Sequence, residues 1–293
     1  METSTPLVSI ITGYYNRKEN LEQSIQSVLD QTYSNFEYII FDDCSTDGTS
    51  ELIAKFSDPR LRVVRHEKNM GFTKGIISAI GQSNGDLIAI HGAGDVSFPE
   101  RITRQVELLQ SDKEIGIVGC LLEDVSNEGT VIHSPVYGDH KSHFTQGEVM
   151  YRKNLYFQVG GYNSMFTYGQ FTNLKLEMLK ISKPDYVNEV LYRRIHFENG
   201  VTKNPLKRIE QKFYMELGVK LAQEGNIIKI DTSKVYVKAC LTYFSLLKKN
   251  TPQYDLFLFH IKNNKGALRI FKLYTFNLLP KDAMLKILRK IYR

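Results

Sequence analysis

The chain has 293 residues, of which 42% are hydrophobic, 24% charged and 11% aromatic, and this ordinary globular usage excludes a disordered, collagen-like or low-complexity chain. The formal net charge of +6 is concentrated near the C-terminus: between residues 262 and 293 nine basic residues stand against one acid, which leaves residues 1–261 with a charge of −2. Because the basic excess is confined to one terminal segment, it does not indicate that the rest of the chain binds nucleic acid, and no nucleic-acid partner is expected.

Strand and helix patterns alternate over the first 125 residues. Short apolar runs predict strands at residues 7–11, 36–41, 61–64, 87–90 and 115–119. Helical spacing of apolar residues predicts helices at 19–29, 45–56, 73–82 and 99–109, the second capped by Ser45 or Thr46 and the last beginning at Pro99. Repeated strand–helix units of this length predict an α/β fold with a mostly parallel sheet flanked by helices, and with a site at the carboxyl ends of the strands.

Longer helical patterns replace these units from about Pro205 onward, at residues 209–223, 233–248, 256–274 and 282–292. The sequence therefore predicts an α/β domain over residues 1–204 and a helical, basic C-terminal region over residues 205–293. The last of these segments has apolar residues on one face and basic residues on another. Such a cationic amphipathic helix suits an anionic membrane surface, and it equally suits a terminal helix docked on the domain with a solvated charged face.

The N-terminus and the cysteines indicate the compartment. Residues 1–6 have neither the basic nor the apolar region of a secretory signal, and the longest uncharged stretch, 154–174, is too polar to span a membrane. The three cysteines, Cys44, Cys120 and Cys240, form neither a zinc pattern nor a disulfide framework. We expect a cytoplasmic protein whose basic tail allows peripheral attachment to the inner face of a membrane.

Polar side chains follow three of the predicted strands, namely Tyr15 and Asn16, then Asp42 and Asp43, then His91 and Asp95. Carboxylates after neighbouring strands suit hydrogen bonds to a base and a ribose, or a cation beside a diphosphate. Aspartate and serine in such places also cap helices, which is the plainer interpretation for residues 45–47. The adjacent carboxylates of Asp42 and Asp43, in contrast, repel each other and need partners.

An ordered set of motifs runs through the same segments. It comprises Val8 to Ile11, Tyr15-Asn16, Ser27 to Tyr33, Phe36-Glu37, Asp42 to Asp47, Asn69 to Lys74, Gly85 to Ala89, Asp95 to Ile102, Met150 to Arg152, Val159 to Tyr162, and Arg194 to His196. In this order, and over roughly the first 200 residues, the set resembles the family 2 glycosyltransferases. The resemblance implies a GT-A fold, a Rossmann-like sheet flanked by helices. It also implies inverting transfer of a sugar from a nucleoside-diphosphate donor, with a UDP-sugar expected, to a polysaccharide or glycolipid acceptor.

The resemblance assigns the residues after the first two strands to a nucleotide pocket. Tyr15 and Asn16 lie where family members begin this pocket. Asp42 resembles the aspartate that pairs with a uracil ring, and Asp43 stands beside it. The implied ligand is therefore a UDP-sugar or another nucleotide sugar.

The phosphate and metal end of the implied site departs from the family pattern. Asp95 belongs to the segment that meets the ribose, the diphosphate and a divalent metal, and Arg194 and His196 match an R-x-H element near the donor phosphates. Both aspartates of the family's D-x-D motif are here glycines, Gly92 and Gly94, which offer no side-chain oxygen. With Asp95 as the remaining metal ligand, Mn²⁺ or Mg²⁺ is expected to bind weakly.

The position of the catalytic base departs as well. Phe171 stands where relatives have the aspartate that deprotonates the acceptor hydroxyl, and the next expected acid is Asn173. Neither side chain accepts a proton at physiological pH. His91 and Glu177 are the candidate substitutes, although a histidine at a strand end is more often structural.

Two hypotheses of function remain open. One is a glycosyltransferase with atypical residues, in which Lys175 or Arg194 neutralises phosphate without a metal and the acceptor is a glycan or is lipid-linked. The other is a catalytically inactive relative that binds a nucleotide sugar or serves as a scaffold for a partner glycosyltransferase. A structural homologue without any ligand is a third, weaker alternative.

Overall fold

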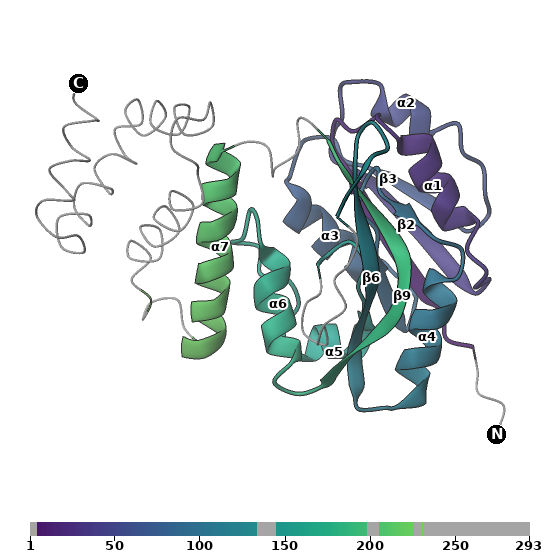
Figure 1. Ribbon diagram of the computed structural model, residues 1–293. Helices are drawn as coiled ribbons and strands as arrows, with labels where there is room; N and C mark the ends of the chain where they lie inside the picture. Colours follow the sequence, from purple (N-terminus) through teal and green to yellow (C-terminus); the bar gives the residue numbers. More distant parts are fainter. Residues whose placement is uncertain (1–4, 134–144, 198–204, 226–229, 231–293) are drawn as a thin grey trace, which may run out of the picture. The chain divides into compact units, whose positions relative to one another are not determined.

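The computed structural model describes residues 5–133, 145–197, 205–225 and 230 (Figure 1). The helices predicted at 233–248, 256–274 and 282–292, the last being the amphipathic segment, lie outside the described residues. Within the described part of the chain, no helix has both the length and the apolar character needed to cross a membrane.

The chain divides into two compact units. One comprises Met1–Thr167 and Leu174–Phe197, and the other comprises Tyr168–Asn173 and Glu198–Arg293. The first unit contains the whole sheet. In the second, the helix α7 (Pro205–Glu224) confirms the helical segment predicted at 209–223.

The N-terminal half of the sheet is parallel, as predicted. Its strands are β1 (Val8–Tyr14), β2 (Phe36–Asp42), β3 (Leu61–Arg65) and β4 (Leu87–Ile90), in the spatial order β3-β2-β1-β4. The helices α1 (Leu21–Leu29), α2 (Thr49–Ile53) and α4 (Arg101–Ser111) pack on one face, and α3 (Phe72–Gly81) packs on the other (Figure 1). The continuous apolar runs of β1, β2 and β4 follow from this cover on both faces.

The rest of the sheet is mixed. Its strands are β5 (Val96–Ser97), β6 (Ile115–Ser126), β7 (Val131–His133), β8 (Met150–Arg152) and β9 (Lys183–His196). The order continues β4-β8-β6-β9-β5, with β7 paired to β6. Because β8 runs antiparallel to both of its neighbours, the sheet as a whole is mixed rather than mostly parallel. β6 and β9 form a long parallel pair, and the helices α5 (Lys153–Gln158) and α6 (Gln170–Met178) lie between β8 and β9 in the chain.

The ring of Phe41 fixes the packing between β1, β2 and α3. It stacks on His66 with 5.7 Å between ring centroids. A Cβ atom at Gly13 would lie 2.2 Å from the Cζ of Phe41, and one at Gly75 would lie 2.3 Å from its Cε2. Real Cβ atoms do not approach other atoms so closely, so the ring occupies the space that side chains at both glycines would need.

Gly13→Ala is therefore expected to lower the free energy of unfolding by about 1–3 kcal/mol, the usual effect of overpacking a core. Phe41→Val removes the obstructing ring, so the same Gly13→Ala change should cost less in that background. Urea denaturation of the two single variants and the double variant measures this coupling. Equal costs in both backgrounds would show that the ring does not constrain Gly13.

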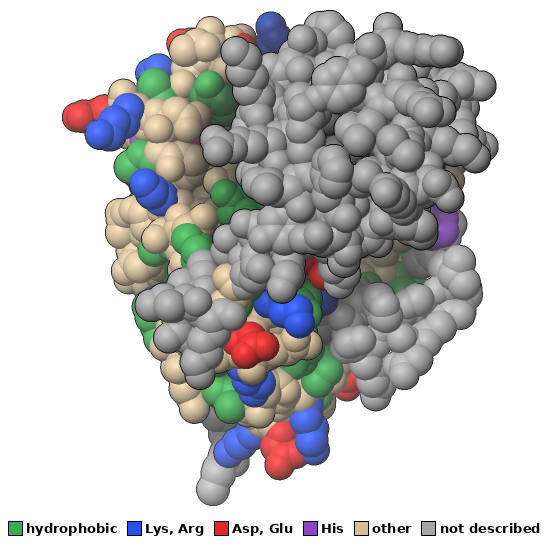
Figure 2. Space-filling model, turned by 90° about the vertical axis from the view of Figure 1, so that its left-hand side faces the viewer, with side chains coloured by type: hydrophobic (Ala, Val, Ile, Leu, Met, Phe, Trp, Pro, Cys, Tyr) green, Lys and Arg blue, Asp and Glu red, His purple; other side chains and the backbone are tan. Residues whose placement is uncertain are grey.

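Charged side chains of both signs are interspersed on the face drawn in Figure 2. Two ion pairs of the described residues involve side chains at the surface: Lys180 lies 2.7 Å from Glu177, and Lys183 pairs with Glu114. Lys183 and Glu114 are well exposed and Glu177 is partly exposed, and ion pairs near the surface contribute little to stability.

Candidate functional site

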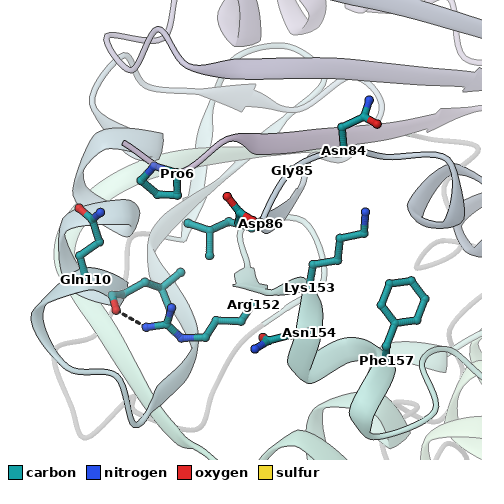
Figure 3. A pocket seen from close by; sticks show the side chains of 11 residues that line it. Pro6, Asn84, Gly85, Asp86, Gln110, Arg152, Lys153, Asn154 and Phe157 are labelled. Atoms are coloured by element: carbon teal, nitrogen blue, oxygen red, sulfur yellow. Dashed lines mark hydrogen bonds between the residues drawn. The ribbon is translucent and has the colours of Figure 1, made fainter. Parts of the chain in front are cut away.

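A cavity of about 530 Å³ lies at the amino ends of β1 and β4, away from the predicted site (Figure 3). Both of its cations are engaged with backbone carbonyls. Nη2 of Arg152 donates to the carbonyl of Leu109 in the last turn of α4, and Nζ of Lys153 donates to the carbonyl of Ser83 just beyond α3, each at 2.5 Å. The two cations thus cap helix ends, which is a structural role.

The predicted site residues gather at the opposite edge of the sheet. We call this region the carboxyl edge: the loops 14–20, 42–49, 65–71 and 91–95, which follow β1 to β4, and the end of β9 at 192–197. The end of β9 joins it through Asp95, whose Oδ1 accepts a 2.9 Å hydrogen bond from the backbone N–H of Ile195. Residues far apart in the sequence therefore meet there, as the parallel half of the sheet requires.

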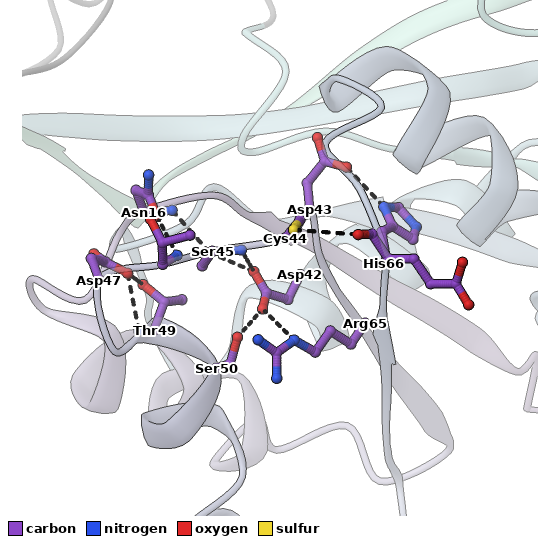
Figure 4. A network of polar contacts seen from close by, with 12 residues as sticks. Asn16, Asp42, Asp43, Cys44, Ser45, Asp47, Thr49, Ser50, Arg65 and His66 are labelled. Carbon is purple, nitrogen blue, oxygen red and sulfur yellow. Dashed lines mark hydrogen bonds and ion pairs between the residues drawn. The ribbon is translucent and has the colours of Figure 1, made fainter.

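Asp42 is 1% exposed, and both of its oxygens are engaged within the protein (Figure 4). Oδ1 accepts hydrogen bonds from the backbone N–H of Ser45 at 3.1 Å and from its hydroxyl at 2.5 Å. Oδ2 accepts a hydrogen bond from the hydroxyl of Ser50 on α2 and lies 4.0 Å from Nε of Arg65. Because Ser45 binds Asp42 instead of capping a helix, α2 begins only at Thr49, and the helix predicted at 45–56 was too long.

Asp43 is 2% exposed and ties the loop after β2 to the loop after β3. Its Oδ1 accepts a 2.8 Å hydrogen bond from the backbone N–H of Met70 and lies 2.9 Å from Nδ1 of His66. Its Oδ2 accepts a 2.8 Å hydrogen bond from the N–H of Gly71. The two adjacent carboxylates thus have the separate partners that their repulsion demands.

A cavity of about 260 Å³ adjoins these contacts. It is formed by the segment that leads into α3 and by a segment before α6, and it is lined by Met70, Gly71, Phe72, Thr73, Lys74, Ser164, Phe166 and Thr167. Two of these lining residues are joined by a hydrogen bond, in which the hydroxyl of Thr73 donates to the carbonyl of Phe166 at 2.6 Å. The cavity is small, and its lining includes Lys74 and the first turn of α3 at the carboxyl edge.

Asn16 joins the loops after β1 and β2, while Tyr15 is left open. The backbone of Asn16 is left-handed, with φ of 47°. Its Oδ1 accepts a 2.8 Å hydrogen bond from the N–H of Thr46, and its own N–H donates to the hydroxyl of Ser45 at 2.9 Å. Tyr15 is 52% exposed, so its ring is available for stacking on a base.

Asp95 points into the protein. Its Oδ2 accepts a 2.7 Å hydrogen bond from the hydroxyl of Tyr192, which in turn accepts a 2.9 Å hydrogen bond from the N–H of Gly92. Its Oδ1 is held by the N–H of Ile195. Burial raises the pKa of Asp95, and the hydrogen bonds from the Tyr192 hydroxyl and the Ile195 N–H oppose that shift.

The two glycines of the altered D-x-D motif have no room for side chains. A Cβ atom at Gly92 would lie 2.2 Å from Oδ2 of Asp95 and 3.0 Å from the hydroxyl of Tyr192. Gly94 has φ of +88°, and its Cβ atom would lie 2.7 Å from Cζ of Phe197. Side chains of neighbouring residues therefore occupy the space that side chains at Gly92 and Gly94 would need.

The residues at this edge do not fit a divalent cation. Mg²⁺ and Mn²⁺ prefer several oxygen ligands, whereas both oxygens of Asp95 already accept hydrogen bonds from within the protein. Among the described residues, no group of three or more His, Cys, Asp or Glu side chains is placed to hold a metal.

His91 is 1% exposed, and both ring nitrogens contact serine hydroxyls. Nε2 lies 3.0 Å from the hydroxyl of Ser24, and Nδ1 lies 3.0 Å from that of Ser97. Burial, followed by the nearby charge of Arg101, lowers the pKa of His91 to about 3. The ring is thus neutral and enclosed. This environment favours the structural role of His91 over the role of a base.

Arg194 and His196 are both held by Asp124 of β6. The guanidinium of Arg194 donates to the two carboxylate oxygens at 2.7 and 2.9 Å, and Nε2 of His196 lies 3.1 Å from Oδ1. Although burial opposes it, hydrogen bonds and charge from these two partners lower the pKa of Asp124. The R-x-H element is therefore anchored to the neighbouring strand.

Some side chains of α6 are buried, and others are partly exposed to solvent. Phe171 is 6% exposed and Asn173 is 7% exposed, with Nδ2 of Asn173 donating to the carbonyl of Gly218 at 3.3 Å. The side chain of Glu177 is 28% exposed and pairs with Lys180. Glu177 is thus a partly exposed acid, whereas burial lowers the pKa of Lys175.

Arg17 is a residue of this edge that sequence reasoning missed. Its guanidinium lies 4.3 Å from the centroid of the Phe197 ring, and its backbone N–H donates to the hydroxyl of Thr49 at 3.0 Å. The available signal was its place directly after Tyr15-Asn16, in the loop where the nucleotide pocket was predicted to begin.

Comparison with known proteins identifies the family. Residues 9–171, more than half of the chain, match the family described as Glycosyl transferase family 2. The chain is 32% identical over 173 residues to the putative glycosyltransferase EpsE of Bacillus subtilis (strain 168), which is 55% of this chain and 62% of that protein. It is 33% identical over 103 residues to the UDP-Glc:alpha-D-GlcNAc-diphosphoundecaprenol beta-1,3-glucosyltransferase WfgD of Escherichia coli, which is 35% of this chain and 41% of that protein.

A solved structure supports the same assignment at the level of the fold. The mannosyltransferase PcManGT from Pyrobaculum calidifontis, in complex with GDP-Man and Mn²⁺, has a TM-score of 0.61 at 14% identity, covering 92% of this chain and 84% of that chain. The mixed sheet flanked by helices is therefore the GT-A fold that the motifs predicted. The chain belongs to glycosyl transferase family 2, and its matched segments span less than two thirds of the length of both relatives named above.

Proposed function

We propose that this chain binds a nucleoside-diphosphate sugar at the carboxyl edge and transfers the sugar to a polysaccharide or lipid-linked acceptor. The observation that carries the proposal is the locked arrangement of the loops after β1 and β2 around two buried carboxylates, Asp42 and Asp43. A rigid set of polar groups beside the exposed ring of Tyr15 suits recognition of a base and a ribose.

Relatives support the ligand classes. The name of WfgD specifies a UDP-glucose donor and a diphosphoundecaprenol-linked acceptor, whereas PcManGT was solved with GDP-Man. Both are nucleoside-diphosphate sugars, so the donor class is shared although the base differs. A UDP-sugar remains our expectation for this chain.

Transfer needs an acceptor hydroxyl to attack the anomeric carbon while the nucleoside diphosphate departs. A general base contributes a factor of about 10² to 10⁴ to such a step. Of the two substitutes predicted from sequence, Glu177 is partly exposed and His91 is enclosed between Ser24 and Ser97. We therefore assign a structural role to His91, which leaves Glu177 as the sequence-predicted candidate for the base that the assays below test.

A second candidate function is binding without turnover, as the nucleotide-sugar-binding partner of an active transferase. The observation that favours it is the pair of buried neutral side chains, Phe171 and Asn173, at the positions of the family's acids. Donor hydrolysis and transfer assays separate the two candidates. Turnover that is lost in Glu177→Gln supports the transferase, and nucleotide binding without turnover supports the partner.

Asp42→Ala is expected to weaken UDP binding by about 1–3 kcal/mol, the contribution of a hydrogen bond to a charged group. Calorimetric titration measures the change. Ser50→Ala is the matched control, because it removes one internal partner of Asp42 but keeps the carboxylate. Equal losses in both variants would mean that Asp42 acts only by holding the loop in place.

A further inference from the structure

The cavity of about 530 Å³ at the amino ends of β1 and β4 has no part in the proposed function (Figure 3). We call it the amino-edge cavity. Its volume lies within the range of about 300–1,000 Å³ that is usual for sites of small organic ligands. Its lining joins segments that are distant in sequence, namely the turn before β4, the end of α4 and the segment from Arg152 to Phe157. The side chains of these segments define what the cavity can hold.

The ring of Phe157 forms an apolar surface in this lining. It is 55% exposed, and it makes an edge-on contact with the ring of Tyr156 at 5.3 Å between centroids. Tyr156 is itself buried, and its hydroxyl accepts a hydrogen bond from the N–H of Tyr162 at 3.2 Å. An exposed aromatic ring on a fixed support is a surface on which the apolar C–H face of a sugar ring can pack.

Hydrogen-bond acceptors and donors both line the amino-edge cavity. Among the described residues, none donates to the exposed carboxylate of Asp86, and none contacts the side-chain amide of Gln110. Oδ1 of Asn154 accepts a hydrogen bond from the N–H of Leu155 at 2.7 Å, whereas its Nδ2 has no acceptor within the described part of the chain. These side chains thus offer a ligand both kinds of polar group.

The two cations of the cavity are held in place by the fold and keep further donors. Nε of Arg152 donates to the carbonyl of Ile115 at 2.9 Å and Nη2 donates to that of Leu109, whereas Nη1 has no acceptor among the residues that the structure describes. Nζ of Lys153 carries three N–H groups, of which the carbonyl of Ser83 accepts one. Donors that are already held in place lose little conformational entropy when they bind a ligand.

This mixture of groups distinguishes between classes of ligand. An apolar ligand would leave the polar groups of the lining without partners. An anion would be attracted by Arg152 and Lys153 but repelled by Asp86, which lines the same cavity. A sugar has hydroxyls that both donate and accept hydrogen bonds, and it has an apolar C–H face. It therefore matches the donors, the acceptors and the aromatic ring together.

We propose that the amino-edge cavity binds an uncharged oligosaccharide, as a carbohydrate site separate from the carboxyl edge. The inference goes beyond the proposed function, since the cavity lies at the opposite edge of the sheet from the residues assigned to the donor. Such a site would hold a polysaccharide at a point away from its reacting end. That use of the site rests on the proposed function, whereas binding of the oligosaccharide does not.

Saturation-transfer NMR and calorimetric titration of the full chain test this inference. The uncharged probes are maltotriose, cellotriose, laminaritriose and triacetylchitotriose, and the acidic probe is trigalacturonate. We expect at least one uncharged trisaccharide to bind, and trigalacturonate to bind more weakly. Phe157→Ala should weaken trisaccharide binding by about 3- to 10-fold, because the packing surface is lost. Asp86→Ala should weaken it by about 10- to 100-fold, because a charged hydrogen-bond acceptor is lost.

Val131→Ala is the matched control. It removes an apolar side chain of similar exposure, 52%, from β7, and it should bind the trisaccharide like wild type. Thermal melts show that each variant is folded, and the affinity for UDP should be the same in all of them because the two edges are separate.

Three results would overturn the inference: no binding of any uncharged trisaccharide, tighter binding of trigalacturonate than of all four, or equal trisaccharide affinity in wild type, Phe157→Ala and Asp86→Ala. The last result would place the trisaccharide elsewhere on the protein. A wild-type protein that binds a trisaccharide at this cavity but does not bind UDP would count against the proposed function alone.

Discussion

Gly92→Asp is expected to lower the free energy of unfolding by about 3–5 kcal/mol and not to create a metal site, even though it restores the residue type of the family motif. The new side chain would begin 2.2 Å from Oδ2 of Asp95 and would displace it from Tyr192. A buried carboxylate would then lose its partner beside a second carboxylate, a change that typically costs several kcal/mol. Denaturant unfolding with and without Mn²⁺ measures both effects.

Two further variants isolate the cause. Gly81→Ala places a methyl group that meets nothing within 4 Å apart from its chain neighbours and the backbone of its own helix, so this control should be neutral or slightly stabilising. Asp95→Ala removes the obstructing carboxylate, so Gly92→Ala should cost less in that background than in wild type. A well-folded Gly92→Asp protein that is stabilised by Mn²⁺ would refute this description of the edge.

Lowering the pH from about 6.5 to 4.5 is expected to destabilise the protein through His91. The pKa of His91 is about 3 in the folded protein, against 6.5 for an ordinary histidine, so the unfolded chain takes up a proton first as the pH falls. The stability contributed by neutral His91 is fully present above pH 6.5 and falls by about 1.4 kcal/mol per pH unit below it.

His91→Gln is the comparison that isolates this effect. Glu148 contributes a slope of opposite sign, because burial raises its pKa to about 7, but it is present in both proteins. The free energy of unfolding of wild type should therefore fall more steeply with acidification than that of His91→Gln. Parallel curves for the two proteins between pH 6.5 and 4.5 would mean that His91 is not held neutral.

Local sequence was enough to predict the N-terminal half of the fold. The strands β1, β2 and β4 are short apolar runs between chain-breaking residues, and the pattern found them because both of their faces are buried. β9 was missed, since most of its residues are only partly buried and its arginines pair with acids of β6, which is distant in sequence. Arg193 pairs with Glu123 across that strand pair at 2.6 Å, a contact that no local pattern contains.

The site was predicted in its residues but not in their contacts. Spacing identified Asp42 and Asp43 and their need for partners, but Ser50, His66 and the backbone of Gly71 became visible only once the chain was folded. From the sequence alone, Gly92 and Gly94 indicate only that two carboxylates are missing. The fold shows instead that Tyr192 and Phe197, from a distant strand and its end, occupy the space beside them.

A calorimetric titration of the wild-type protein with UDP-glucose and GDP-mannose in EDTA is the most direct test of donor binding at the carboxyl edge without a metal. We expect that one of the two sugars binds without any divalent cation and that added Mn²⁺ leaves its affinity unchanged. Binding that appears only when Mn²⁺ is present would contradict it.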